Sequence, residues 1–202
     1  GLLINARRLE DYRLDGEYLI AVDGTEQHRF KDRDRPHCPQ CLKQTHSNGT
    51  TDYFHSVLEA KLVTREGLAL SMASEFIENG GREYDKQDCE LKAFYRLAPE
   101  LKRQFPRLAI CLLLDSLYAN ETLLDICVAN SWSFYVGFKE GSIPNLYKQM
   151  LETMAKHPAQ VVRGEDDTEQ YTCRWACNLT HKGHRLHAVM CEVKAKKDGK
   201  ET

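Results

Sequence analysis

Two aspartates follow directly after apolar runs, at points where a buried strand would end. Asp23 follows residues 18–22, and Asp115 follows residues 108–114, which are apolar throughout. Each run is typical of a central strand that delivers its aspartate to the strand's C-terminal tip. The two aspartates lie too far apart in the sequence to share a hairpin, so they meet only if both strands belong to one sheet. Two carboxylates held side by side are costly unless a cation lies between them.

A pair of aspartates suits Mg²⁺ or Mn²⁺, which prefer hard oxygen ligands and keep water molecules for a substrate phosphate. Two such ions about 4 Å apart activate a water or a 3′-hydroxyl for in-line attack on a phosphodiester. The plainer interpretation is that Asp23 begins a turn with Gly24 and that Asp115 caps the segment after it. The Asp-Gly-Thr ending also occurs in haloacid-dehalogenase-like phosphatases. Here Ala21 stands at the position of their nucleophilic aspartate, which excludes an aspartyl-phosphate.

Glu90 is a candidate third acid. It lies early in a stretch, residues 86–105, whose apolar residues recur at helical spacing. From the start of such a helix its carboxylate could complete a site with the two aspartates, while Lys86 or Lys92 could contact a phosphate. The alternative is that Glu90 belongs to a solvated face of the helix.

A second candidate site contains sulfur and nitrogen ligands. Cys38 and Cys41 have the Cys-x-x-Cys spacing of a zinc knuckle, and His46 and His55 follow them. Together they would form a Cys₂His₂ set, which suits the tetrahedral coordination of Zn²⁺. His28 and His37 are candidate substitutes for either histidine in the loop region 28–56. A thiol redox pair is less favoured, because no thioredoxin-like βαβ pattern surrounds the cysteines.

The remaining pattern predicts the elements that position these residues. Strands are expected at 18–23, 52–63, 67–76, 108–115 and 133–138, and helices at 86–105, 120–130 and 142–156. The order β-β-β-α-β-α-β-α indicates an α/β fold with a mixed sheet of the ribonuclease-H-like type. In such a sheet the first and fourth strands are neighbours, which would bring Asp23 and Asp115 together. A hairpin is expected near the C-terminus, around residues 171–193.

The composition fits one globular domain. The chain has 202 residues, of which 42% are hydrophobic and 29% charged, and its formal net charge is −2. No apolar run approaches the roughly 20 residues of a membrane helix, and the first residues lack the order of a signal peptide. The eight cysteines are therefore expected in a reducing cytoplasm, mostly as small buried groups. A net charge near zero gives no global attraction to nucleic acid.

Several short motifs, taken in order, resemble insertion-sequence transposases of the DDE type. The resemblance covers roughly residues 18–150. It implies a ribonuclease-H-like core that cuts and joins DNA with divalent metal, with Asp23 and Asp115 as the first two acids of a triad. It also implies transposon ends and target DNA as partners, a homodimer, and a nucleoid-associated cytoplasmic location without membrane contact. The motifs are Val22-Asp23-Gly24-Thr25, Cys38-x-x-Cys41 with Tyr53-Phe54-His55, Lys86-Gln87-Asp88-Cys89-Glu90, and Leu114-Asp115-x-x-Tyr118-Ala119.

The expected organisation is a lead-in segment at 1–17, a catalytic core at 18–158, and a hairpin insertion with a charged tail at 159–202. The third acid of such transposases lies on a late helix, and no match to its context occurs between 141 and 202. The core is therefore expected to stop before that helix, which would leave this fragment inactive. Two other functions remain open: a ribonuclease-H-like nuclease or resolvase that uses Glu90, and a non-catalytic, zinc-stabilised module that binds DNA or protein.

Overall fold

The computed structural model of the chain describes residue 4 and residues 7–32, 35–80 and 87–196. The chain divides into two compact units, Gly1–Gly137 and Phe138–Thr202. Asp23, Asp115, Glu90 and the Cys38–Cys41 pair all belong to the first unit. Among the described residues, no helix is both long enough and apolar enough to cross a membrane.

The first unit is built on one mixed sheet. Its central path runs β3-β1-β5-β6, and both β2 and β4 pair with β3. The pairs among β1, β2, β3 and β4 are antiparallel, whereas β5 is parallel to β1 and β6 is parallel to β5. The strands are β1 (Tyr18–Phe30), β2 (Leu42–Thr45), β3 (Thr51–Val63), β4 (Ala69–Ile77), β5 (Ile110–Leu114) and β6 (Ser133–Val136).

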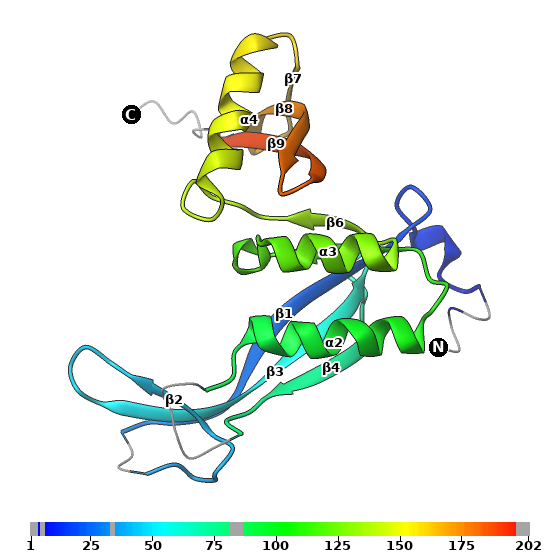
Figure 1. Cartoon of the computed structure of the whole chain (residues 1–202). Coiled ribbons are helices and arrows are strands. Elements are labelled where there is room, and N and C mark those ends of the chain that lie inside the picture. Colours follow the sequence, from blue (N-terminus) through cyan, green and yellow to red (C-terminus); the bar gives the residue numbers. More distant parts are fainter. Residues whose placement is uncertain (1–3, 5–6, 33–34, 81–86, 197–202) are drawn as a thin grey trace. The chain divides into compact units, whose positions relative to one another are not determined.

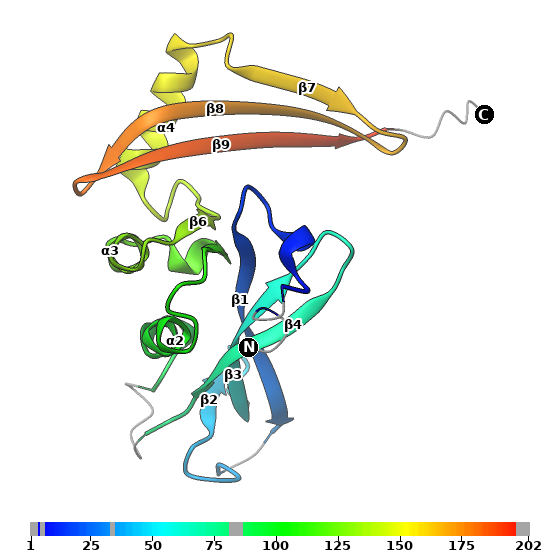
Figure 2. The same cartoon turned by 90° about the vertical axis from the view of Figure 1, so that its right-hand side faces the viewer.

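Two helices, α2 (Glu90–Gln104) and α3 (Glu121–Asn130), lie on the same face of this sheet (Figures 1 and 2). Short 3₁₀ turns, η1 (Glu10–Tyr12) and η3 (Ser116–Tyr118), accompany them. The alternation along β1 sends even-numbered residues towards the helices, since a strand turns successive side chains to opposite faces. The buried core therefore combines strand residues with one stripe of α2, including Ile20, Val22, Leu58, Leu62, Phe94, Leu97, Leu101 and Leu112.

Strands β1 and β3 extend beyond this core into what we call the distal arm, residues 26–30, 42–45 and 51–56. The sequence predicted a first strand at 18–23 only. Residues 26–30 are largely exposed, yet they continue β1 because β3 supplies their backbone partners. Inside the arm, Asp52 is buried and its Oδ2 accepts a hydrogen bond from Arg29 Nη1 at 2.8 Å. The Arg29 guanidinium also lies 4.6 Å from the centre of the Phe54 ring.

The second unit packs one helix, α4 (Pro144–Lys156), on a three-stranded antiparallel sheet. The sheet consists of β7 (Val161–Glu165), β8 (Glu169–His181) and β9 (His184–Ala195) in that order. The hairpin expected at 171–193 is present as β8 and β9, and β7 is a further strand that the sequence did not predict. The boundary expected after residue 158 falls inside this unit, because α4 shares its core. The core side chains are Leu146, Met150, Met154, Ala176, Leu179 and Ala188.

A disulfide joins Cys173 and Cys191, which lie directly opposite each other on β8 and β9. The sequence predicted reduced cysteines, mostly as small buried groups. The structure corrects this prediction for Cys173 and Cys191, because the hairpin register brings together two cysteines that are far apart in the sequence.

The buried Asp52 gives the distal arm a dependence on pH. Hydrogen bonds from Arg29 and then His46 lower the pKa of Asp52 to about 2, against about 3.9 for an unperturbed aspartate. A carboxyl with a lowered pKa stabilises the fold above its unfolded value, and that contribution is lost as the pH falls towards its folded value. We therefore expect Asp52→Asn to lower the melting temperature at neutral pH, and the difference from the wild type to shrink between about pH 4 and 2.

Thermal unfolding of both proteins across this pH range measures the effect, since titrations that the two proteins share cancel in the difference. Asp11→Asn, at an exposed aspartate outside the arm, is the matched control. A difference that stays constant from neutral pH down to pH 2 would contradict the role given to Asp52.

Candidate functional site

Asp23 and Asp115 lie at the same edge of the sheet. β1 and β5 are parallel neighbours, and the last pair in their register is Ala21 with Leu113. Each aspartate stands two residues beyond that pair, so the two occupy equivalent positions on adjacent chains, which run about 4.8 Å apart in a sheet. Both side chains are exposed. The structure therefore brings together the two acids whose meeting the sequence predicted.

The plainer role expected for Asp115 is also present. Its Oδ1 accepts a hydrogen bond from the backbone N–H of Leu117 at 2.8 Å and thereby caps η3. This bond fixes the carboxylate just past the end of β5. Capping and metal binding are compatible, because a carboxylate has two oxygens and about four lone-pair sites.

Glu90 reaches the same edge from the helix face. It is the first residue of α2, and its carboxylate lies against Gly24, the residue after Asp23. A Cβ atom built on Gly24 would lie 2.5 Å from Glu90 Cδ and 2.9 Å from its Cγ. Because glycine has no Cβ, Gly24 leaves room for the Glu90 carboxylate next to Asp23. Glu90 thus lies beside β1 rather than on the wholly solvated helix face of the alternative interpretation.

The charges of the two aspartates act on Glu90. Burial raises the pKa of Glu90, and the negative charges of Asp23 and then Asp115 raise it further, while Tyr118 opposes the shift. A cation would relieve this repulsion because it favours the ionised form of all three. The oxygens of the three acids do not all lie within 4.8 Å of one another, so binding a single ion requires side-chain rotations, to which the exposed Asp23 and Asp115 are suited.

Tyr118 adds a polar group that sequence reasoning did not assign to the site. The residue is 1% exposed, and its ring packs edge-on against Phe94 of α2, with ring centres 5.3 Å apart. Its hydroxyl approaches the Glu90 carboxylate without reaching hydrogen-bond geometry and has no partner among the described residues. Burial, followed by the charges of Glu90, Asp115 and Asp23, raises the pKa of the phenol. The only signal in the sequence was an aromatic residue three positions after Asp115.

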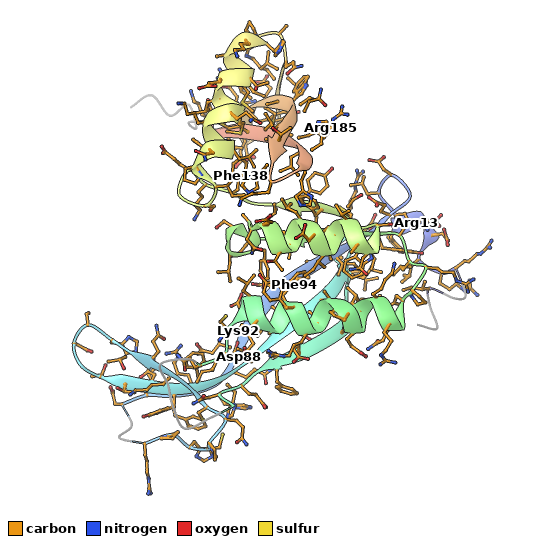
Figure 3. The ribbon with its side chains drawn as sticks, viewed as in Figure 1. Arg13, Asp88, Lys92, Phe94, Phe138 and Arg185 are labelled. Atoms are coloured by element: carbon orange, nitrogen blue, oxygen red, sulfur yellow. A yellow bond between two sulfur atoms is a disulfide. The ribbon has the colours of Figure 1, made fainter. Side chains whose placement is uncertain are left out.

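The structure describes only one of the two lysines that the sequence proposed as phosphate contacts, Lys86 and Lys92. Lys86 lies outside the described residues. Lys92 lies near the start of α2, as Figure 3 shows, and its Nζ donates to the carbonyl of Gln87 at 3.2 Å. The described structure therefore gives Lys92 a backbone partner close to Glu90.

Three of the four predicted sulfur and nitrogen ligands form a second cluster. Cys38 Sγ lies 3.4 Å from Cys41 Sγ and 3.2 Å from His55 Nε2, and Cys41 Sγ lies 3.6 Å from the same nitrogen. Zinc–sulfur bonds of about 2.3 Å in a tetrahedral site separate two sulfurs by roughly 3.8 Å. The cluster could therefore bind a metal such as zinc. Cys41 is fully buried, and burial is the main cause that raises the pKa of its thiol.

His46, the fourth predicted ligand, does not join this cluster. Its Nε2 lies 3.0 Å from Asp52 Oδ2 instead. The register of the arm explains this, because β2 pairs Gln44 with Asp52 and so places the end of β2 beside that acid. His37, a candidate substitute, stacks on Phe30 with ring centres 4.7 Å apart. Within the described residues the cluster therefore has one histidine and two cysteines.

No family model and no curated protein matches the sequence. What the chain does must therefore follow from the two clusters themselves: three carboxylates at one sheet edge, and two thiols with an imidazole on the distal arm.

The contact between Gly24 and Glu90 predicts the effect of a single methyl group. Gly24→Ala places a Cβ where the Glu90 carboxylate lies, so the flexible end of Glu90 must move away from Asp23. We expect at least about a 10-fold loss of Mn²⁺ affinity, comparable to disturbing an outer-shell partner of a metal site. Thermal stability should change little, because the group that moves is a side-chain terminus.

Calorimetric or electron paramagnetic resonance titration with Mn²⁺ measures this loss. Gly141→Ala is the matched control, because a Cβ there meets no atom within 4 Å. Equal Mn²⁺ affinity in Gly24→Ala and the wild type would show that Glu90 takes no part in ion binding.

Proposed function

We propose that the chain is the catalytic core of a DDE-type DNA transposase, which uses divalent metal to cleave phosphodiesters and transfer DNA strands. The observation that carries the proposal is the equivalent placement of Asp23 and Asp115 just beyond the parallel pairing of β1 with β5. The carboxylate of Glu90, the first residue of α2, lies beside them against Gly24. Three neighbouring acids, two of whose charges raise the pKa of the third, Glu90, are a donor set suited to Mg²⁺ or Mn²⁺.

The arrangement of the sheet supports the proposal. The path β4-β3-β1-β5-β6, antiparallel on one side of β1 and parallel on the other, agrees with the strand order of a ribonuclease-H-like sheet. Three of the four motifs that resemble DDE transposases also lie close together. Val22–Thr25 and Leu114–Ala119 surround the two aspartates, and the described part of the third motif, Gln87–Glu90, opens α2 beside them.

Each acid would have a separate task in such a centre. Asp115 is held by the Leu117 N–H, so it can offer its carboxylate with little loss of freedom on binding. Asp23 is exposed on the long strand β1 and can turn towards an ion or substrate. A bound divalent cation would supply Lewis-acid activation of the attacking oxygen and stabilise the leaving oxygen. The cation also offsets the acids' negative charge, which would otherwise repel a DNA phosphate.

A nuclease or resolvase that uses Glu90 as its third acid is the second candidate. The same contact with Gly24 favours it, since it places Glu90 beside Asp23 within this chain. The two candidates differ in product: a resolvase or nuclease leaves hydrolysed ends, whereas a transposase also joins a 3′-hydroxyl to a new strand.

We further propose that Cys38, Cys41 and His55 bind a structural Zn²⁺. The two cysteines lie between β1 and β2, and the histidine lies on β3, so the ion would join the connection to the arm's central strand. The arm is rich in exposed polar residues, and its apolar burial is limited to a few side chains such as Leu42 and Tyr53. A bound metal would therefore add to the small apolar contribution that these residues make. This site alone would suit a zinc-stabilised binding module.

Replacement of single acids tests the carboxylate site. We expect Asp23→Asn and Asp115→Asn each to weaken Mn²⁺ binding by at least about 100-fold, the upper range seen when merely an outer-shell partner of a metal is lost. Metal-dependent cleavage of duplex DNA by this chain that is lost in both variants and in Glu90→Gln would favour the nuclease or resolvase, because the transposase is expected to take its third acid from a late helix. Asp167→Asn, an exposed acid in the second unit, is the control. If both aspartate variants bind Mn²⁺ as the wild type does, the proposal is wrong.

Replacement of single histidines tests the zinc site. The wild type should bind one Zn²⁺ per chain tightly, His55→Ala should lose it, and His46→Ala should retain it, because His46 contacts Asp52 instead of the cysteines. Zinc content measured by atomic absorption after gel filtration gives the stoichiometry. Zinc lost from both histidine variants would restore the four-ligand set predicted from the sequence and contradict the three-ligand cluster.

A further inference from the structure

We infer that Gln87 is a positioning residue, which couples metal binding at Cys38, Cys41 and His55 to the placement of Glu90. The inference rests on the proposed function, since it concerns the same carboxylate site. It concerns an additional property of the chain: the thiol cluster on the distal arm and the carboxylates at the sheet edge act as one linked system rather than as two independent sites.

The first link is a pair of hydrogen bonds between Gln87 and the backbone of β2. The backbone N–H of Lys43 donates to Gln87 Oε1 at 2.9 Å, and Gln87 Nε2 donates to the carbonyl of Lys43 at 2.9 Å. A side-chain amide can satisfy both groups because it carries a donor and an acceptor. The two residues are 44 positions apart in the sequence. Lys43 lies two residues after Cys41, so the bond holds Gln87 next to the thiol cluster.

A second link joins the Cys-x-x-Cys segment to the end of β4. The backbone N–H of Asn79 donates to the carbonyl of Gln40, which lies between the two cysteines, at 3.0 Å. Asn79 is buried. The segment that carries both thiols is therefore bonded to the chain on either side of the connection that leads from β4 to α2. Fixing this segment with a metal would fix both bonded neighbours.

The start of α2 depends on these contacts because its own cap is weak. The N-cap residue, Cys89, makes no side-chain hydrogen bond to the helix, whereas Asn120 caps α3 in the usual way. Instead, Gln87 holds the chain before the helix from one side, and Asp88 forms an ion pair with Arg96 at 2.6 Å on the other. Glu90 follows immediately, so a shift of Gln87 moves the acid that lies against Gly24.

The chain of contacts therefore runs from the cysteines through β2 to Gln87 and on to Glu90. Figure 1 shows the start of α2 near the part of the sheet to which β2 is paired. Coupling between two binding sites is reciprocal, so zinc should strengthen Mn²⁺ binding by the factor by which Mn²⁺ strengthens zinc binding. Typical couplings of this kind change affinity by about 5-fold or more.

The experiment compares the whole chain with zinc bound and after zinc is removed by a chelator. Two readouts are measured: Mn²⁺ affinity by electron paramagnetic resonance, and amide hydrogen exchange in the first turn of α2, read at Ala93, whose N–H donates to the carbonyl of Cys89. In the wild type, zinc removal should weaken Mn²⁺ binding by about 5-fold or more and speed exchange in that turn. Gln87→Leu removes both hydrogen bonds at similar size. This variant should still bind one zinc. Its Mn²⁺ binding should be weak and its hydrogen exchange at the start of α2 fast, both with zinc bound and after zinc is removed.

Gln104→Leu is the matched control, because Gln104 lies at the other end of α2 and its side chain donates to Glu100 of the same helix. It should behave as the wild type does, and a comparison of melting temperatures separates coupling from general loss of stability. Zinc removal that leaves exchange in the first turn unchanged would overturn the inference. The inference would also be wrong if zinc removal weakened Mn²⁺ binding in Gln87→Leu as much as in the wild type. If Asp23→Asn binds Mn²⁺ as tightly as the wild type does, the proposed carboxylate site is wrong. The effect of zinc removal on hydrogen exchange in α2 would still test whether the thiol cluster is coupled to the helix.

Discussion

The parallel pairing of β1 with β5 is the interaction on which the candidate site depends. It fixes Asp23 and Asp115 at equivalent positions on adjacent strands. A shift of one residue in this register would turn the strand's side chains to the opposite face and separate the acids. The pairing is secured by apolar side chains on the helix-facing side of both strands, such as Ile20 and Leu112, which are fully buried. The geometry of the polar edge is therefore set by the packing of the apolar face.

The carboxylate edge and the distal arm are stabilised by different kinds of interaction. At the edge, a large core holds the backbone firmly and the acids are left to repel one another. In the arm, only a few side chains such as Leu42 and Tyr53 are buried and apolar, and polar contacts supplement them. Asp52 gathers Arg29 and His46 there, and the thiols gather around His55. Gln87 connects the two regions, and it does so with a neutral amide that adds no charge to an already anionic site.

Much of the site could be predicted from the sequence because its signals are local. The apolar runs before Asp23 and Asp115, and the helical spacing after Glu90, each reveal an element and its end. The mixed α/β sheet followed from the order of those elements. The rest depends on contacts between distant residues. The four-residue β2 is too short and polar to show a period, and β1 runs on to Phe30 because β3 supplies its hydrogen bonds. His46 contacts Asp52 rather than the cysteines because the pairing of β2 with β3 places it there.

The cysteines place opposing chemical demands on one chain. Cys38 and Cys41 can ligate a metal only as reduced thiolates, whereas Cys173 and Cys191 are joined by a disulfide in the second unit. An oxidant can also join the neighbouring thiols of Cys38 and Cys41, whose sulfurs lie 3.4 Å apart, and so displace a metal from them. A strong reductant breaks both disulfides and leaves the thiols of Cys38 and Cys41 free to bind a metal. Strong oxidation therefore removes the metal cross-link and strong reduction removes the Cys173–Cys191 disulfide, whereas bound zinc, by shielding its thiolates, would let both cross-links coexist.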